Sequence, residues 1–332
     1  MDYALIWAVI IAIAVLAYVI LDGFDLGVGI LFPSLNDDEK DAAMNSIAPI
    51  WDGNETWLVL GGGGLFAVFP LAYSVIMPAV YAPIIAMLIG LIFRGVAFEY
   101  RYRTKKGRYL WDWSFAGGSF VATFSQGMIL GTLLQGIEVA DRQYAGGWFD
   151  WLTPFSIFCG IAVTMGYTLL GGCWLLIKTS GSIEAKLFPK CKRLTLMFLA
   201  AIGVVSIWLP FISPEIAARW FTFPNAAAFF LIPIISACAA YKLWHSLSAQ
   251  KALAAYMWTL VIYLMAFAGF AISIFPYMVP RAITLWEAAA PENSLKFLFA
   301  GAAFLLPIII AYSAYSYWVF RGKVRADEGY HE

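Results

Sequence analysis

The sequence predicts an all-α, polytopic membrane protein with nine transmembrane helices. Hydrophobic residues occupy 62% of the 332 positions and charged residues only 13%, whereas a soluble domain has about 25% charged residues. Apolar runs of about 20 residues, the length that crosses the hydrocarbon core of a bilayer, recur along the whole chain. The formal net charge is zero, so the composition gives no indication of nucleic-acid binding.

Short polar links separate the apolar runs, so residues 1–332 are predicted to form a single integral membrane domain. The first run follows the letters MDYALIWAV, which contain neither a basic segment nor a small-residue cleavage site, and we expect it to be a retained helix. Nine helices are compatible with two four-helix bundles and one peripheral helix, although no internal repeat establishes that division. The predicted helices are 4–32, 46–69, 74–100, 112–134, 155–178, 194–212, 224–247, 254–277 and 296–320.

The placement of lysine and arginine predicts how these helices cross the membrane. If the N-terminus lies outside, 16 of the 21 basic residues fall on the inner side and four on the outer side, with Arg94 inside a helix. The positive-inside rule therefore places the C-terminus in the cytoplasm. The 16 inner residues are Lys40, Arg101, Arg103, Lys105, Lys106, Arg108, Lys178, Lys186, Lys190, Lys192, Arg193, Lys242, Lys251, Arg321, Lys323 and Arg325.

Charged residues within the first three helices all fall toward the predicted cytoplasmic face. Each ionised group at mid-bilayer costs about 2.5–3.5 kcal/mol on insertion scales, so such groups are expected to face protein or water and to pair. One cation among several acids leaves at least one carboxylate without a partner, and burial favours its neutral, proton-carrying form. A string of such acids is suited to proton transfer. The six residues are Asp22, Asp25, Asp52, Glu55, Arg94 and Glu99.

A structural explanation of these charges stays open. The i, i+3 spacing of Asp22 with Asp25, and of Asp52 with Glu55, puts both acids of each pair on one helix face. If the second helix begins at residue 50, however, Asp52 lies only about 3 Å deep and is simply interfacial. Arg94 can equally be a structural counter-ion for one of the acids.

Residues 61–64 are four consecutive glycines within the second predicted helix. A phosphate-binding loop would continue with lysine and then serine or threonine, but leucine and phenylalanine follow here. Small residues in membrane helices let neighbouring backbones approach closely. We therefore expect tight packing of this helix.

Histidine and cysteine are poorly placed to hold a metal or haem. The two histidines are His245, near the cytoplasmic end of a predicted helix, and His331 in the C-terminal tail. Haem iron in membrane proteins is usually held by histidine or methionine, and no histidine lies deep in a helix. The four cysteines show no C-x-x-C spacing. We predict no metal site and no haem bound by this chain alone.

Four stretches resemble subunit II of the cytochrome bd-type quinol oxidases. They are DGFDLGVG (22–29), NSIAPIWDGNETWLVLGGGGLFAVFP (45–70), LIFRGVAFEYR (91–101) and FPYMVP with TLWEA (275–288). The resemblance covers essentially the whole chain. The chain length and the WDGNETW letters are most similar to the cyanide-insensitive branch of that family.

The resemblance implies a haem-free subunit of a complex in the bacterial cytoplasmic membrane that oxidises quinol and reduces oxygen to water. Haems b, with a further haem b or d at the oxygen site, and the quinol-oxidation loop belong to the partner, subunit I. The implied fold of subunit II is two four-helix bundles and one peripheral helix. Some members also carry a small single-helix subunit, and some hold a structural quinone in subunit II. A quinone or lipid is thus a further candidate ligand.

In the same family, acids at the interface of the two large subunits are proposed to carry protons from the cytoplasm. By motif, Asp25 and Asp52 match those acids, and we add Glu55 to the predicted route. No catalytic residue is expected in this chain. The predicted supporting positions are Asp22, Trp51, Asn54, Arg94 and Glu99.

Two other functions fit part of the pattern. A proton-coupled transporter would use intramembrane acids, but transporters often carry matching interruptions in two halves, and the second half of this chain lacks matching charges. A purely structural scaffold would hold the partner without using any acid in proton transfer.

Overall fold

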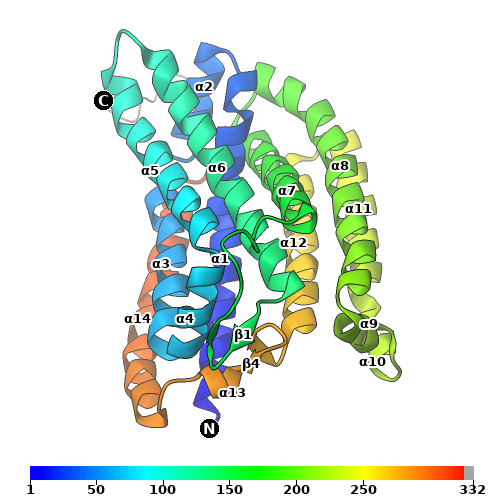
Figure 1. Cartoon of the computed structure of the whole chain (residues 1–332). Helices are drawn as coiled ribbons and strands as arrows, with labels where there is room; N and C mark the ends of the chain where they lie inside the picture. Colours follow the sequence, from blue (N-terminus) through cyan, green and yellow to red (C-terminus); the bar gives the residue numbers. More distant parts are fainter. Residues whose placement is uncertain (325–332) are drawn as a thin grey trace.

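The computed structural model describes residues 1–324, which are mostly helical, with two short hairpins and short turns between the helices. The long helices lie side by side along one common direction (Figure 1). Within the described residues, seven helical stretches are long and apolar enough to cross a membrane, which confirms an all-α membrane protein. These are Tyr3–Ser34, Tyr81–Arg103, Pro154–Lys178, Ser182–Ile212, Asn225–Ser248, Ala252–Ile274 and Glu292–Val319.

Two predicted membrane helices, 46–69 and 112–134, form helices that are not among these seven. Helix α3 (Trp51–Val68) has 18 residues and contains two acids and the four glycines. Helix α6 (Arg108–Gln135) has 28 residues but is rich in glycine, serine, threonine and glutamine. At 1.5 Å per residue α6 is about 42 Å long, so length alone does not prevent it from crossing. Nine crossings and two four-helix bundles stay a prediction.

Proline explains two helix boundaries that differ from the prediction. The predicted helix 74–100 is divided at Val80 into α4 (Pro70–Ala79) and α5 (Tyr81–Arg103). The predicted helix 224–247 is likewise divided into α10 (Asn225–Phe229) and α11 (Leu231–Ser248). Because proline lacks an N–H group and is tolerated in the first turn of a helix, a new helix begins just before Pro83 and just before Pro233.

The remaining elements complete the chain between the long helices. Helix α8 begins at Ser182 rather than near residue 194, because its basic first turns continue the membrane helix without a break. The other elements are α1 (Tyr3–Leu31), η1 (Phe32–Ser34), α2 (Asp37–Asn45), β1 (Val139–Ala140), β2 (Gln143–Tyr144), α7 (Pro154–Lys178), α9 (Pro214–Phe221), α12 (Ala252–Ile274), β3 (Tyr277–Val279), β4 (Ile283–Thr284), α13 (Leu285–Ala288) and α14 (Glu292–Val319). Each pair of strands is antiparallel.

Helix α7 is the most buried of the seven membrane stretches and packs directly against α1. A Cβ atom at Gly27 of α1 would overlap the backbone carbonyl of Tyr167, and one at Gly171 of α7 would overlap the backbone of Gly27. Only glycine permits this approach. The backbones of α1 and α7 therefore touch at the level of the charged residues of α1.

The four glycines of α3 do not all pack as predicted. Gly61 and Gly64 lie against Val15 and Ile11 of α1, within 3.4 Å of where a Cβ atom would be. Gly62 and Gly63 are exposed and have no atom within 4 Å of that position. The prediction of tight packing is therefore correct for Gly61 and Gly64 and wrong within this chain for Gly62 and Gly63. Consecutive residues of a helix point in different directions, so only two of the four glycines face α1.

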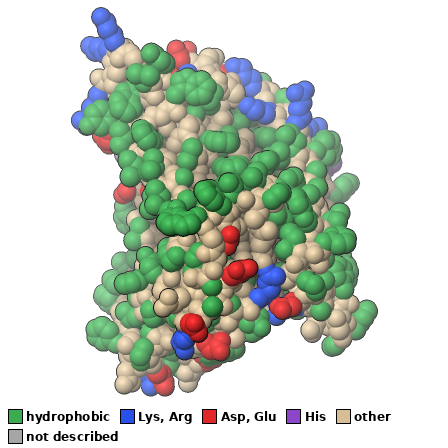
Figure 2. Space-filling model, in the orientation of Figure 1, with side chains coloured by type: hydrophobic (Ala, Val, Ile, Leu, Met, Phe, Trp, Pro, Cys, Tyr) green, Lys and Arg blue, Asp and Glu red, His purple; other side chains and the backbone are tan. Residues whose placement is uncertain are grey.

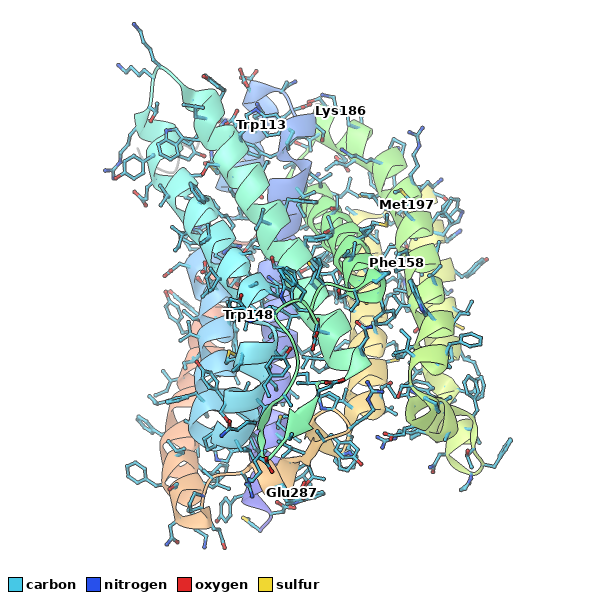
Figure 3. All side chains as sticks on the ribbon, viewed as in Figure 1. Trp113, Trp148, Phe158, Lys186, Met197 and Glu287 are labelled. Carbon is cyan, nitrogen blue, oxygen red and sulfur yellow. The ribbon has the colours of Figure 1, made fainter. Side chains whose placement is uncertain are left out.

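The two ends of the molecule differ in charge. Lysine and arginine gather at the end that contains α2, and a broad apolar surface lies below it (Figure 2). Lys186 lies at this end together with Trp113, while Glu287 lies at the opposite end (Figure 3). The N-terminus is at the end of Glu287 (Figure 1). Arg325 and His331, which the sequence analysis discussed, lie outside the described residues.

Candidate functional site

A buried ion cluster joins α1, α3 and α5 around Arg94. The guanidinium Nη1 atom lies 2.5 Å from Oδ1 of Asp22, and Nη2 lies 2.7 Å from Oε2 of Glu55. The side chains of Arg94 and Asp22 are completely buried, whereas the Glu55 side chain is 28% exposed. One cation thus binds an acid in the interior and an acid at the protein surface.

Trp51, at the first position of α3, lies beside the cluster. Its ring stacks on Phe98 with the ring centroids 4.8 Å apart, and the guanidinium of Arg94 lies 5.8 Å from its ring centroid. A Cβ atom at Gly95 would meet this ring at 3.4 Å, so glycine leaves room for the indole next to Arg94. An aromatic face near a cation is favourable, so Trp51 lies where it can stabilise Arg94, and its supporting role in function stays a prediction.

Asp25, one turn beyond Asp22 on α1, has a different set of partners. Its Oδ2 atom accepts a hydrogen bond of 2.8 Å from Nδ2 of Asn54. The Oδ1 atom of Asn54 in turn accepts one of 2.8 Å from the Tyr317 hydroxyl. Asp25 is fully buried, and its Oδ1 atom has no hydrogen-bond partner among residues 1–324. The two acids of α1 are thus held differently, one by a cation and one by a neutral amide.

Two of the six charges named in the sequence analysis lie outside this cluster. Asp52 is exposed in the first turn of α3. The Glu99 side chain is 54% exposed and pairs with Arg103 of its own helix at 3.3 Å. Glu99 therefore does not take part in the ion cluster of Arg94, and its predicted supporting role stays a prediction. Asp52 lies one helical turn before Glu55 but at the surface.

Tyr317 is a residue of the site that the sequence analysis missed. It lies in the letters YSYWVF of α14, which resemble an ordinary aromatic belt at a membrane interface. The rings of Phe24 and Trp174 both contact it edge-on. Because Tyr317 is 263 residues away from Asn54, no local pattern could have linked the two.

A second ion cluster, centred on the buried Arg101, lies at the basic end. The fully buried side chain of Arg101 binds Asp112 at 2.6 Å and Asp41 at 2.5 Å. Lys40 also binds Asp112 at 2.7 Å, and Arg108 binds Asp41. In the sequence these cations indicated only the orientation of the helices. In the structure they fasten α2 across the ends of α5 and α6.

Glu39 ties α2 to α8 at the same end. It closes the capping box of α2 with Asn36 and lies 2.7 Å from the ammonium group of Lys186. Burial opposes its ionisation, but the hydrogen bonds from Lys186 and from the Asn36 backbone hold the pKa of Glu39 below its ordinary value of 4.5. Glu39 is therefore an ionised structural residue at neutral pH.

Residues 1–324 contain no group of three or more His, Cys, Asp or Glu side chains placed to hold a metal ion. His245 lies in the last turn of α11, near the surface of the chain rather than among the acids of α1 and α3. The acids of the candidate site bind arginine and amide groups instead.

These features define a helical membrane protein that keeps ionisable side chains paired inside three neighbouring helices. The family model for subunit II of the cytochrome bd terminal oxidases matches residues 3–320, and the chain belongs to this family. The family predicted from the four sequence motifs is thereby confirmed.

Individual relatives agree with this assignment. Subunit 2 of the cytochrome bd-I ubiquinol oxidase of Escherichia coli K12 is 28% identical over 362 aligned positions, which cover 97% of this chain and 95% of the relative. Subunit 2 of the Bacillus subtilis cytochrome bd ubiquinol oxidase is 28% identical, with 97% of each chain covered. A chain of the bd oxidase structure from Geobacillus thermodenitrificans has the same fold, with a TM-score of 0.77 at 15% identity, covering 96% of this chain and 99% of that one. The chain is thus part of an oxidoreductase complex of the respiratory chain, which implies a partner subunit.

Proposed function

We propose that this chain is the haem-free subunit II of a quinol:oxygen oxidoreductase. In this role it binds and stabilises a haem-bearing subunit I and provides a cytoplasmic route for the protons that are consumed when oxygen is reduced to water. The observation that carries the proposal is the pairing of Asp25 with a neutral amide directly beside an ion pair that is already complete. A buried carboxyl without a cation of its own can gain and lose a proton without breaking a salt bridge.

The route we propose enters at the surface of α3 and reaches the interior through that helix. Asp52 is exposed, Glu55 is partly exposed one turn later, and Asn54 reaches from the same helix to Asp25. The exposure of these side chains therefore decreases from Asp52 to Glu55 to Asp25. Arg94 holds Glu55 in place, and Trp51 covers the guanidinium.

Binding of subunit I to the outer face of α3 is supported by the residues exposed there. Asp52, Thr56, Gly62 and Gly63 are all exposed on this helix. An acid and an uncovered glycine backbone are poorly suited to contact lipid, whereas small residues favour close packing of a second helix. The partner would cover the acids and enclose the route.

The charge asymmetry supports an orientation with the basic end in the cytoplasm of a bacterial cell and the N-terminus outside. In this orientation the ion cluster of Arg94 lies in the cytoplasmic part of the membrane, on the side from which protons are taken.

Purification of the tagged chain from its native membrane tests the assignment to the complex. We expect a haem-containing polypeptide to co-purify with it. The Asp25→Asn variant is expected to keep this partner and its haem spectrum but to consume oxygen at least about tenfold more slowly, because a positioned proton-transfer group typically contributes 10²–10⁴-fold. Asp38→Asn, the same change at an exposed acid of α2, is the control. Normal turnover of Asp25→Asn would count against a route through Asp25.

A further inference from the structure

A hydrogen-bond chain of three buried or half-buried side chains runs from α7 through α6 to α1. The Tyr167 hydroxyl donates to Oε1 of Gln126 at 2.9 Å, and Nε2 of Gln126 donates to the Tyr18 hydroxyl at 2.8 Å. Tyr18 and Tyr167 are 4% and 2% exposed. None of these residues belongs to the proposed proton route.

The chain ends beside Asp22. Tyr18 precedes Asp22 by one turn of α1, so the two side chains share a face of the helix. The Tyr167 ring packs against the same turn, because a Cβ atom at Gly23 would lie 3.0 Å from its Cε1 atom. Glycine at position 23 thus lets the phenol of α7 approach the backbone next to Asp22.

The direction of the hydrogen bonds leaves one proton for Asp22. The Tyr167 proton is directed to Gln126, and the Gln126 amide proton is directed to Tyr18. The hydroxyl proton of Tyr18 is therefore free to face Asp22. Oδ1 of Asp22 binds Arg94, while its buried Oδ2 accepts no hydrogen bond from any side chain among residues 1–324. An ionised carboxylate can only accept hydrogen bonds, so the donor end of the chain matches it.

We propose that Tyr18, Gln126 and Tyr167 are positioning residues that keep Asp22 as the permanent anion of Arg94. Asp25 then is the carboxylate of α1 that exchanges protons, and this second part rests on the proposed function. The charged and titratable groups that face Asp22 are Arg94, Glu55, Asp25, Tyr18, Tyr167 and Tyr317. Arg94 is the sole cation of this set, and the phenol of Tyr18 is the uncharged donor that we assign to the Oδ2 atom of the same acid, which is unpartnered within residues 1–324.

Infrared spectra of the purified complex, labelled with ¹³C-aspartate and recorded at a fixed acidic pH, test the proposal directly. We expect the band of a protonated aspartic acid to increase about tenfold in Tyr18→Phe, the ratio that corresponds to one hydrogen bond to a charged group. The Asp22→Asn variant identifies the band. Tyr167→Phe acts on Asp22 only through Gln126, so the band of protonated Asp22 should also increase in this variant, but by less than in Tyr18→Phe. Tyr167→Phe provides the test if Tyr18→Phe does not assemble.

Tyr263→Phe is the matched control. Tyr263 is buried and stacks beside Tyr167, but its hydroxyl has no hydrogen-bond partner within residues 1–324, so its loss should leave the band unchanged. Equal spectra for Tyr18→Phe and the parent would overturn the proposal, since the Tyr18 proton would then face Gln126. The double variant Tyr18→Phe/Gln126→Met should match Tyr18→Phe alone, because both changes break one chain.

The infrared result does not depend on turnover. If Asp25→Asn consumes oxygen normally but Tyr18→Phe shows the expected band, the proton route fails while the positioning of Asp22 holds. If Asp25→Asn is slow and Tyr18→Phe leaves the spectrum unchanged, the route holds and the positioning proposal is wrong.

Discussion

Arg94 and Asp22 form an ion pair with no exposed surface on either side chain, and the guanidinium and carboxylate are 2.5 Å apart. They come from α5 and α1, which are 72 residues apart in the chain. Such a pair is costly to bury, and removing one partner leaves the other charge without compensation. The pair is therefore expected to matter for assembly as well as for the position of Glu55.

Arg94→Gln is expected to destabilise the protein by about 3–5 kcal/mol, the usual cost of breaking a buried ion pair. Thermal unfolding and the yield of the purified complex measure this loss. Arg103→Gln, at an exposed arginine of the same helix, should change stability by less than about 1 kcal/mol. In Arg94→Gln/Asp22→Asn no buried charge of this pair remains, and part of the stability should return. If Arg94→Gln were as stable as the control Arg103→Gln, Arg94 would have no structural role.

Tyr317→Phe tests whether α14 takes part in the site. The change removes the hydroxyl that donates to Asn54 and leaves the amide free to rotate away from Asp25. We expect oxygen consumption to fall severalfold, with unchanged haem content. Tyr315 is two residues earlier on α14 and 62% exposed, so Tyr315→Phe should behave like the parent. If both variants turn over at the parental rate, the hydroxyl of Tyr317 has no part in the route.

Glu39 predicts an acid-dependent loss of stability at the basic end. The pKa of Glu39 in the folded protein lies below its ordinary value of 4.5, so the folded state stabilises the ionised carboxylate. Its contribution is therefore fully present above about pH 5 and is lost as the pH falls through and below 4.5. Thermal unfolding between pH 3 and pH 7 measures it, and Glu39→Gln should lose part of this dependence. Glu99→Gln, at an exposed acid, serves as the comparison. If the stability of Glu39→Gln depends on pH as steeply as that of the parent, the ion pair of Glu39 with Lys186 of α8 does not cause this dependence.

The outer face of α3 predicts where the partner binds. Gly62→Leu and Gly63→Leu should leave the fold of this chain intact, because nothing lies within 4 Å of either Cβ position, but should reduce the amount of haem-bearing partner that co-purifies. Gly203 of α8 has equally open surroundings, so Gly203→Leu is the matched control and should retain the partner. Equal recovery of the partner in all three variants would exclude this face from the interface.

The helices and the family could be predicted from the sequence, whereas the internal pairing of the site could not. Asp22 and Asp25 have the same residue type, the same helix and the same face, and their local sequence gives no reason to assign Arg94 to one of them. The rotation of α3 and α5 about their axes decides that Arg94 reaches Asp22 and that Asn54 reaches Asp25. For the same reason Glu99, although it shares a motif with Arg94, faces outward.

The sequence by itself determined that this protein is a membrane protein, which end is basic and to which family it belongs, because hydropathy, charge and motifs are properties of consecutive residues. The tertiary structure alone decided which acids are paired, which glycines stay uncovered and which distant hydroxyls join the site. Tyr317 and Gln126 contact residues that are 263 and 108 positions away. Such contacts depend on how whole helices pack, and no short stretch of sequence specifies that packing.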